Sequence, residues 1–406
     1  MEIKKGRDLS PPMQLQIEIP LQLTIDIQNK KIPIQELTSA LKGIEAAILG
    51  RVLEEIDSVL ISSICGKGYG RNEYHKHQKE KRTIVTQLGK TTFNVTRVKE
   101  KSTGRTFCPL YDLIEFDERR NYQPDIAAIA VDYALSMSYR ESRQRLERIT
   151  DSPSHLTIWR RVQELGRTGK EFEYESFVSA DGTKLHVNPK SGSGKLEVKV
   201  IAGKNVITGV NEGYKEMKER HEIRAVVVGD ADKDLSCFEE RQIDLIHVWR
   251  EVNYKLWEHK VDLETRKRYV NEVKGILLRL KNALDNSDLR SRIERAEKTL
   301  NEFAEEMESK GYWRVSRFFK RHMKGILLFA YKKLEGIAIP WHNNWMERLM
   351  GEIAKRMKNK WMSWSARGAR NLLNLLLRRY VERERYESFI RELIGKGYMV
   401  EVKFQV

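Results

Sequence analysis

Three acidic residues occur where their carboxylates could meet at one point. Asp181 and Asp230 each follow a short apolar run typical of a strand, and Glu347 lies early in a helix expected after Pro340. Cleavage of a phosphodiester by two metal ions needs several carboxylates together, because magnesium prefers oxygen ligands and keeps positions open for water and phosphate. The three residues therefore predict a catalytic site that holds two Mg²⁺ or Mn²⁺ ions.

Each of these acids also has an ordinary alternative. Asp181 begins an Asp-Gly pair, which is common in simple turns, and Glu347 alone would be a solvated helix residue. Asp232 and Asp234 offer competing carboxylates, although either could instead cap the following helix. Asp230 is preferred because it lies nearest the strand end. The catalytic interpretation therefore rests on the three acids taken together.

The elements before the acids predict an α/β sheet. Three successive β-type runs are followed by a helical stretch ending near Arg220 and by a strand of buried type. A further helix from about Lys233 leads to a candidate fifth strand. The expected strands cover residues 172–181, 195–203, 205–210, 225–230 and 243–249. This order indicates mixed strand directions, with the acids at one edge of the sheet.

Asp230 lies 49 residues after Asp181, and Glu347 lies 117 residues after Asp230. The longer gap contains residues 250–335, where dense charge and apolar residues at spacings of three and four predict helix throughout. This segment is typical of an insertion rather than of a sheet element. The elements expected after Pro340 are helices over 341–361 and 367–386 and a short strand over 399–404.

The N-terminal part is expected to be helical and then β. Short alternating apolar stretches occupy residues 10–32, and helical spacing predicts one long amphipathic helix over 33–65, used for packing or dimerisation. Residues 66–105 contain eleven Lys and Arg against three Asp and Glu, and β-branched residues alternate about a glycine-containing turn. This pattern predicts a basic β-hairpin.

Residues 125–168 predict three short helices in the order of a helix-turn-helix. Ser138 with Glu141 three residues later forms a capping box that opens the second helix. In the third helix the residues expected to face the core are Ile158, Val162 and Leu165. The residues then available to a DNA groove are His155, Thr157, Arg160, Arg161 and Gln163. A three-helix bundle without DNA recognition would give the same pattern.

The composition favours a protein that binds nucleic acid. The 406 residues suffice for two or three domains, and 74 Lys and Arg against 58 Asp and Glu give a net charge of +16. Such a surface attracts polyanions, whereas heat adaptation would explain the density of charge but not its sign. Cys65, Cys108 and Cys237 form no CxxC pair, which argues against disulfides and structural zinc. With no export signal and no membrane-spanning run, a cytoplasmic location without a membrane partner is expected.

The three acidic segments resemble those of a known family. The segments DGTKLHV, VVVGDADKDL and HNNWMERLMGEIAKRMKNKW are similar to the acidic blocks of the Mutator-like DDE transposases of prokaryotic insertion sequences. In that family the third block has an Asn, a Glu-Arg pair and a basic cluster. The matching residues here are Asn343 or Asn344, Glu347, Arg348, Lys355 and Arg356. The resemblance covers about residues 170–380, and the basic hairpin with its following helices is similar to the DNA-binding half of such transposases.

The resemblance implies an α/β fold with an RNase H-like catalytic domain and an all-helical insertion before the third acid. A helical and β-hairpin DNA-binding region with a helix-turn-helix would precede it. The expected segments are an N-terminal strand and amphipathic helix over 1–65, the basic β-hairpin region over 66–120, the helix-turn-helix over 121–168, the first catalytic part over 171–249, the helical insertion over 250–339, and the second catalytic part over 340–406.

The implied activity is DNA transposition. The protein would bind the terminal inverted repeats of its element, cleave DNA with metal-activated water and transfer the 3′ end into target double-stranded DNA. It would act as a homodimer or larger assembly, because two element ends must be paired, and would associate with the nucleoid. Two other functions remain open: a catalytically inactive or domesticated DNA-binding relative, and another RNase H-like nuclease that cleaves without strand transfer.

Further residues of the site follow from the same resemblance. Members of the family often carry a Cys or His pair after the fifth strand, where this chain has His247 and Arg250. His247 is expected to line the catalytic pocket, and its alternative is an ordinary hydrogen-bonded core histidine. Basic residues C-terminal to Glu347 could grip flanking phosphates, or could simply complete the helix terminus as a solvated face. These residues are Lys355, Arg356, Lys358 and Lys360.

Overall fold

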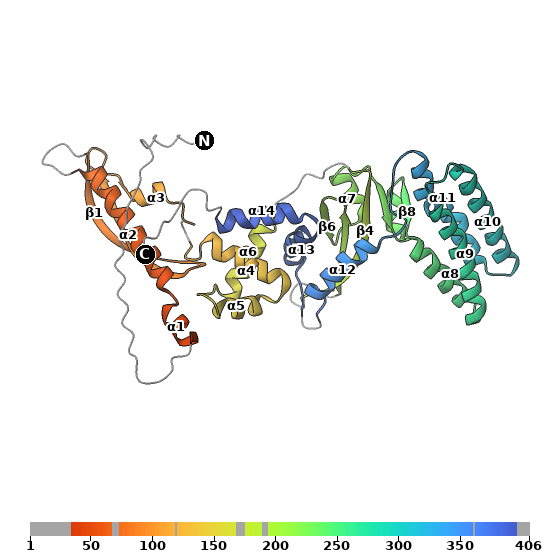
Figure 1. Ribbon diagram of the computed structural model, residues 1–406, viewed down its shortest axis with the longest axis horizontal. Helices are drawn as coiled ribbons and strands as arrows, with labels where there is room; N and C mark the ends of the chain where they lie inside the picture. The colour runs from red at the N-terminus through yellow and green to blue at the C-terminus, as the bar shows by residue number, and fades with distance from the viewer. Residues whose placement is uncertain are drawn as a thin grey trace. The chain divides into compact units, whose positions relative to one another are not determined.

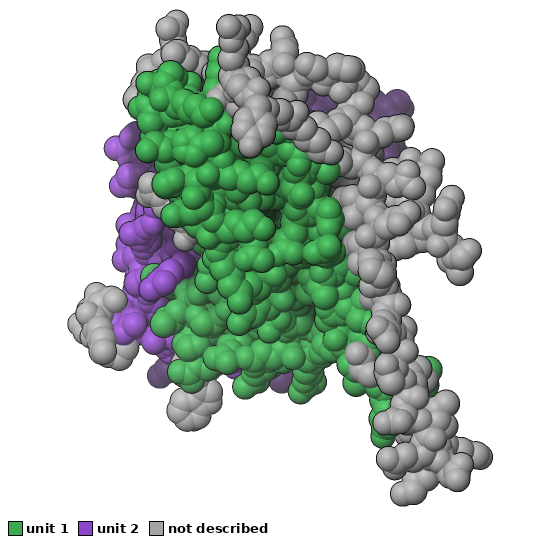
Figure 2. Space-filling view, turned by 90° about the vertical axis from the view of Figure 1, so that its left-hand side faces the viewer, with its two compact units in different colours: residues 1–159, 390–406 green, residues 160–389 purple. Residues whose placement is uncertain are grey.

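The protein combines helices with two sheets, as a mixed α/β chain is expected to do (Figure 1). The computed structural model describes residues 34–66, 73–117, 120–167, 175–188, 194–359 and 362–395. Two compact units are present, one formed by Met1–Trp159 with Ile390–Val406 and the other by Arg160–Phe389 (Figure 2). The strands expected within 10–32 and over 399–404, together with Lys360, lie outside the described residues.

The first unit is built around the predicted basic hairpin, which is confirmed. Strands β1 (Tyr74–Thr86) and β2 (Gly89–Glu100) pair antiparallel, and β3 (Thr106–Phe107) extends the sheet beside β2. The tight turn depends on Gly89, whose φ of 115° lies in the region that favours glycine. Local alternation and one glycine therefore sufficed to predict this element.

The helix expected over 33–65 is two helices, α1 (Ile34–Leu41) and α2 (Ile44–Cys65). Gly43 separates them with a φ of 93°, a backbone conformation that ends a helix. Helix α2 then packs against β2, burying apolar side chains that share one core. These residues include Leu53, Leu60, Phe93, Val95 and Leu110. The packing part of the prediction is confirmed, and the single helix was wrong.

Helix α3 (Pro109–Leu113) precedes the three helices expected over 125–168, which are α4 (Pro124–Ser136), α5 (Tyr139–Glu147) and α6 (His155–Leu165). Ser138 caps α5 by accepting from the backbone N–H of Glu141, whose side chain returns to the cap. The capping box is therefore confirmed, and Ser142 further ties α5 to α4 through the carbonyl of Ala130.

The second unit contains a five-stranded sheet in the order β6-β5-β4-β7-β8. The strands are β4 (Phe177–His186), β5 (Lys195–Ala202), β6 (Val206–Val210), β7 (Val226–Gly229) and β8 (Arg241–Ile243). Strand β4 pairs antiparallel with β5 and parallel with β7, so the predicted mixed directions are confirmed. Helix α7 (Tyr214–Arg220) and the 3₁₀ helix η2 (Lys233–Cys237) contact each other and share a core with one face of the sheet.

The fifth strand lies earlier and is shorter than expected. Residues 241–243 form β8, and the rest of the expected strand is the start of helix α8 (Leu245–Glu258). Asp244 begins this helix by accepting from the backbone N–H of Ile246. Leu245, Val248 and Val252 follow at helical spacing and are fully buried, which is why the segment folds as a helix.

The helical segment expected over 250–335 is confirmed. Helices α9 (Leu263–Asn282), α10 (Leu289–Ser309) and α11 (Trp313–Leu334) pack with α8 side by side in Figure 1 and share one apolar core. Helix α12 (Asn344–Met357) then packs on β4, α13 (Ala366–Val381) packs on β6, and α14 (Arg383–Ile394) follows. None of the described helices is long and apolar enough to cross a membrane.

Helix α11 approaches β8 closely because residue 325 has no side chain. A Cβ on Gly325 would lie 2.9 Å from the carbonyl oxygen of Arg241. We expect Gly325→Ala to lower the free energy of unfolding by about 1–3 kcal/mol through overpacking. Gly275→Ala in α9 is the matched control, since nothing lies within 4 Å of that position; it should raise stability by up to about 1 kcal/mol. Urea unfolding checks both variants, and equal midpoints would contradict the close approach.

Candidate active site

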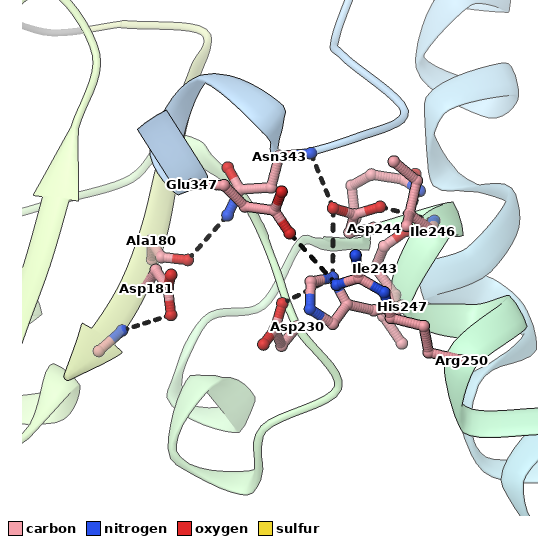
Figure 3. Close-up of polar contacts among 12 residues, drawn as sticks. Ala180, Asp181, Asp230, Ile243, Asp244, Ile246, His247, Arg250, Asn343 and Glu347 are labelled. Carbon is pink, nitrogen blue, oxygen red and sulfur yellow. Dashed lines mark hydrogen bonds and ion pairs between the residues drawn. The ribbon is translucent and has the colours of Figure 1, made fainter. Parts of the chain in front are cut away.

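The structure brings the three predicted acids together from three elements (Figure 3). Asp181 lies within β4, opposite Val200 of β5, and Asp230 follows the end of the parallel neighbour β7. Glu347 lies in the first turn of α12, which packs on β4. The turn alternative for Asp181 is wrong, because the strand continues beyond it to His186.

The charges of these carboxylates act on one another. Burial raises the pKa of Asp230 to about 6, and the nearby Asp181 adds to the rise while His247 opposes it. Burial likewise raises the pKa of Asp181, with a further contribution from Glu347. Desolvation and like charge both disfavour ionised carboxylates, so this cluster costs stability. Clusters of this kind are typical of functional sites.

Two basic side chains of α8 lie against the cluster. Nδ1 of His247 lies 3.1 Å from Oδ1 of Asp230 and 3.3 Å from Oδ2 of Asp244. Nη1 of Arg250 lies 3.3 Å from Oε1 of Glu347. The hydrogen-bonding partner Asp244 and, after it, the charge of Asp230 raise the pKa of His247. His247 thus faces the acids and follows the fifth strand, β8, as expected, although it lies in the first turn of helix α8 and not within the strand expected over 243–249.

Asp244 and Asn343 form the frame of the site. Asp244 is fully buried and accepts from the backbone N–H groups of Ile246 and of Asn343, at 2.7 and 2.9 Å. The side-chain amide of Asn343 donates to the carbonyl of Ala180, the residue before Asp181. The carbonyl of Asn343 accepts from the N–H of Glu347 one turn later. Two hydrogen-bonded residues therefore connect β4, α8 and α12 in the region that holds the three acids.

Asp244 is a site residue that sequence patterns did not single out. Its signal was present, because an aspartate directly before apolar residues at helical spacing is a common helix N-cap. The helix N-cap was missed because residues 243–249 were expected to form a strand. Asn343, by contrast, was one of two asparagines considered for the third acidic segment, and the structure places it and not Asn344 in the buried position.

The competing acids near Asp230 have other partners. The side chain of Asp232 caps η2 by accepting from the backbone N–H of Asp234 at 3.0 Å. The carboxylate of Asp234 forms an ion pair with Lys199, which is buried on β5. Asp230 is thus the acid of this segment that contacts His247, and the capping alternative for Asp232 is confirmed.

The basic residues near the end of α12 that were expected to bind phosphate differ in exposure and in their contacts. Lys355 is exposed and pairs with Glu352 on the same helix. Arg356 is buried, with its guanidinium over the ring of Trp364, so its expected exposure to DNA was wrong. The apolar face of α12 includes position 356 because Ile353 and Met357 beside it are also buried. Lys358 acts on the pKa of Asp181 and so lies near the acids.

The residues expected to face DNA on α6 are only partly exposed. Arg160 is exposed, and His155 is half-buried. The hydroxyl groups of Thr157 and Ser154 are hydrogen-bonded to each other. The side chain of Arg161 is 11% exposed and forms an ion pair with Glu164. The expected exposure of Gln163 was wrong, because its side chain is buried and accepts from Asn371. The apolar residues expected to face the core, Ile158 and Val162, are buried as predicted, and Leu165 is partly buried.

The donor types at the site suit a hard divalent cation. Carboxylate oxygens are the ligands that magnesium prefers, and Oδ1 of Asn343 is a further oxygen that is buried without a hydrogen-bond partner. Within the described ranges, no three acidic, histidine or cysteine side chains stand at metal-binding positions as they are placed. His247 and Arg250 instead contact two of the carboxylates.

Comparisons with known proteins place the chain in a family. A protein of Archaeoglobus fulgidus, described as an uncharacterized protein, is 70% identical over 102 residues, which are 25% of this chain and the whole of that relative. The chain belongs to the same family as this archaeal protein. Residues 28–188 also match the model of an uncharacterised protein family, UPF0236. That match includes the basic hairpin, the three helices α4 to α6 and β4 with Asp181.

Proposed function

We propose that the chain is a DNA transposase that cleaves the ends of an insertion sequence and joins them to target DNA. The observation that carries the proposal is the convergence of Asp181, Asp230 and Glu347 from β4, the end of β7 and α12. These residues are far apart in the sequence, and burial raises the pKa of both Asp181 and Asp230, so holding these two charges beside each other costs stability. Packing alone gives no reason for such a cluster, whereas phosphodiester chemistry does.

The proposal includes an RNase H-like catalytic domain. The mixed sheet that carries the first two acids and the helices α9 to α11 that precede the third acid support it. This arrangement is what the resemblance to Mutator-like DDE transposases implies. The basic hairpin and the helices α4 to α6, as a helix-turn-helix, would bind the terminal inverted repeats, with the protein acting as a dimer or larger assembly at the nucleoid.

Asp181, Asp230 and Glu347 would hold two Mg²⁺ or Mn²⁺ ions. When bound, such ions activate water or a 3′ hydroxyl and stabilise the leaving oxygen. Asn343 and Asp244 fix the start of α12, and so the position of Glu347, relative to β4. His247 stands beside Asp230, where an imidazolium would contact a phosphate oxygen of the strand being cleaved.

A DNA end-joining assay tests this function. The full chain is mixed with a labelled duplex carrying the element end and a target plasmid, in magnesium, in manganese or with EDTA. We expect nicked and joined products only with metal, and loss of both in Asp181→Asn. Asp285→Asn is the control, because that carboxylate is exposed and pairs with Lys333 away from the acids.

The other outcomes are equally specific. Full joining by Asp181→Asn would contradict the assignment of the site. Tight DNA binding without nicking by the unaltered chain would establish an inactive DNA-binding relative. Cleavage of any duplex without joining would establish a nuclease.

A further inference from the structure

A second polar site lies in the catalytic unit, between η2, β8 and α11. A pocket of about 470 Å³ is lined by residues of these three elements. This volume is within the range of pockets that hold small ligands. Four cationic residues line it, and they are Lys233, Arg241, Arg321 and Lys324. The close packing of α11 on β8 at Gly325 forms part of its wall.

The guanidinium of Arg241 is held by neutral groups. Its Nη1 donates to the backbone carbonyl of Asp232 at 2.7 Å, and its Nη2 lies 3.3 Å from Nδ1 of His322. Burial and then the charges of Arg241 and Arg321 lower the pKa of His322 to about 4, so this ring is neutral at pH 7. These hydrogen bonds therefore position the guanidinium of Arg241 without an ion pair, and the carboxylate of Asp232 acts on it only through space.

The acidic residues of the lining do not compensate the cations either. Glu240 forms an ion pair with Lys332, and Glu239 is 94% exposed with Lys218 at 3.9 Å. Among the described residues, Lys233, Arg321 and Lys324 have no carboxylate within ion-pair distance. The pocket thus has an excess of positive charge, and guanidinium groups suit phosphate oxygens in both charge and geometry.

We propose that this pocket binds a phosphate of the DNA strand that enters the carboxylate site. We expect the ligand to be DNA because the loop after β7 links the pocket to the acids. Asp232, whose backbone carbonyl accepts from Arg241, is two residues from Asp230 in this loop. A strand bound at Arg241 and Arg321 is thereby positioned beside the acids. This inference rests on the proposed function for the identity of the strand, and it assigns to α11 of the helical segment a direct part in holding the substrate.

The test measures DNA binding by the full chain in EDTA, so that no cleavage occurs. Arg321→Ala with Lys324→Ala removes two exposed cations of the pocket. Arg290→Ala with Lys298→Ala is the matched control, because it removes the same charge from exposed positions of α10 outside the pocket. We expect the pocket variant to weaken binding of a duplex about tenfold at 100 mM salt and to lower the salt slope by about 1 to 2. The control should change the affinity less than about twofold.

Each outcome decides the proposal. An equal loss of DNA affinity in both double variants would show only a long-range effect of charge and would overturn the proposal. Unchanged DNA affinity in both variants would overturn it as well. Inorganic phosphate binding that depends on Arg321 and Lys324, with unchanged DNA affinity, would show a site for a free anion and would also overturn it. Binding is measured without metal and so does not depend on joining. If the pocket variant binds DNA more weakly but the unaltered chain joins no DNA, the transposase proposal is contradicted and the phosphate site is supported. Unchanged urea midpoints exclude unfolding as the cause.

Discussion

Asp230→Asn is expected to abolish metal-dependent nicking and joining, with a loss of at least about 1,000-fold. The carboxylate is the acid of its segment that faces His247 and Asp181, and its amide replacement would bind a divalent cation weakly. A loss of this size corresponds to about 4 kcal/mol of transition-state stabilisation. The rate of nicking of a labelled duplex in magnesium measures it.

Asp232→Asn is the matched control for this prediction. Asp232 is exposed and caps the short helix η2, a role that asparagine also performs well. Nicking should therefore stay within about threefold of the unaltered protein, in contrast to the loss in Asp230→Asn. The reverse order of effects would assign the metal ligand to Asp232. Asp230→Asn should not lower the urea midpoint, because it removes a carboxylate whose ionised form is disfavoured by burial and by the charge of Asp181.

Asp244→Ala is expected to lower the free energy of unfolding by about 2–4 kcal/mol. The change removes the cap of α8, worth about 1 kcal/mol, and leaves the buried N–H of Asn343 without its acceptor, at about 1–3 kcal/mol. Nicking by the folded protein should also fall, because the start of α12 then loses one of the contacts that position Glu347. Urea unfolding and the nicking rate measure the two effects separately.

Asp262→Ala provides the comparison. Asp262 caps α9 by accepting from the N–H of Thr265, but it lies at the surface and away from the acids. Its loss should cost only about 1 kcal/mol and leave nicking unchanged. Asp244→Asn keeps an acceptor oxygen and should recover part of the stability. If Asp244→Ala were no more damaging than Asp262→Ala, the buried frame around Asn343 would be the wrong explanation for the position of α12.

Elements with strong local signals were predicted well from the sequence. The basic hairpin followed from alternation about Gly89, and α5 followed from the capping box of Ser138 and Glu141. Interactions within a few residues decide such elements, so the sequence pattern contains most of the information. The same reasoning failed at Gly43, because a glycine within a helical pattern is either tolerated or a terminus, and the backbone φ decides between them.

Errors in burial had a different cause. Gln163 and Arg356 are polar residues that were expected at the surface, and both are buried. Gln163 is matched by the amide of Asn371, more than 200 residues later in the chain, and Arg356 lies over the ring of Trp364. Helical spacing shows which residues share a face, but it does not show what that face packs against.

The sequence by itself determined the types of the acids and most of the elements that carry them. Strand patterns located Asp181 and Asp230, and a helix after Pro340 located Glu347. The tertiary structure alone decided that these carboxylates share one region and that Asp244 holds the start of α12. It also decided the partners of the competing acids, since Asp234 pairs with Lys199 and Asp232 caps η2. The physical reason is that strand pairing and helix packing bring together groups separated by 49 and 117 residues, and such contacts leave no local pattern in the sequence.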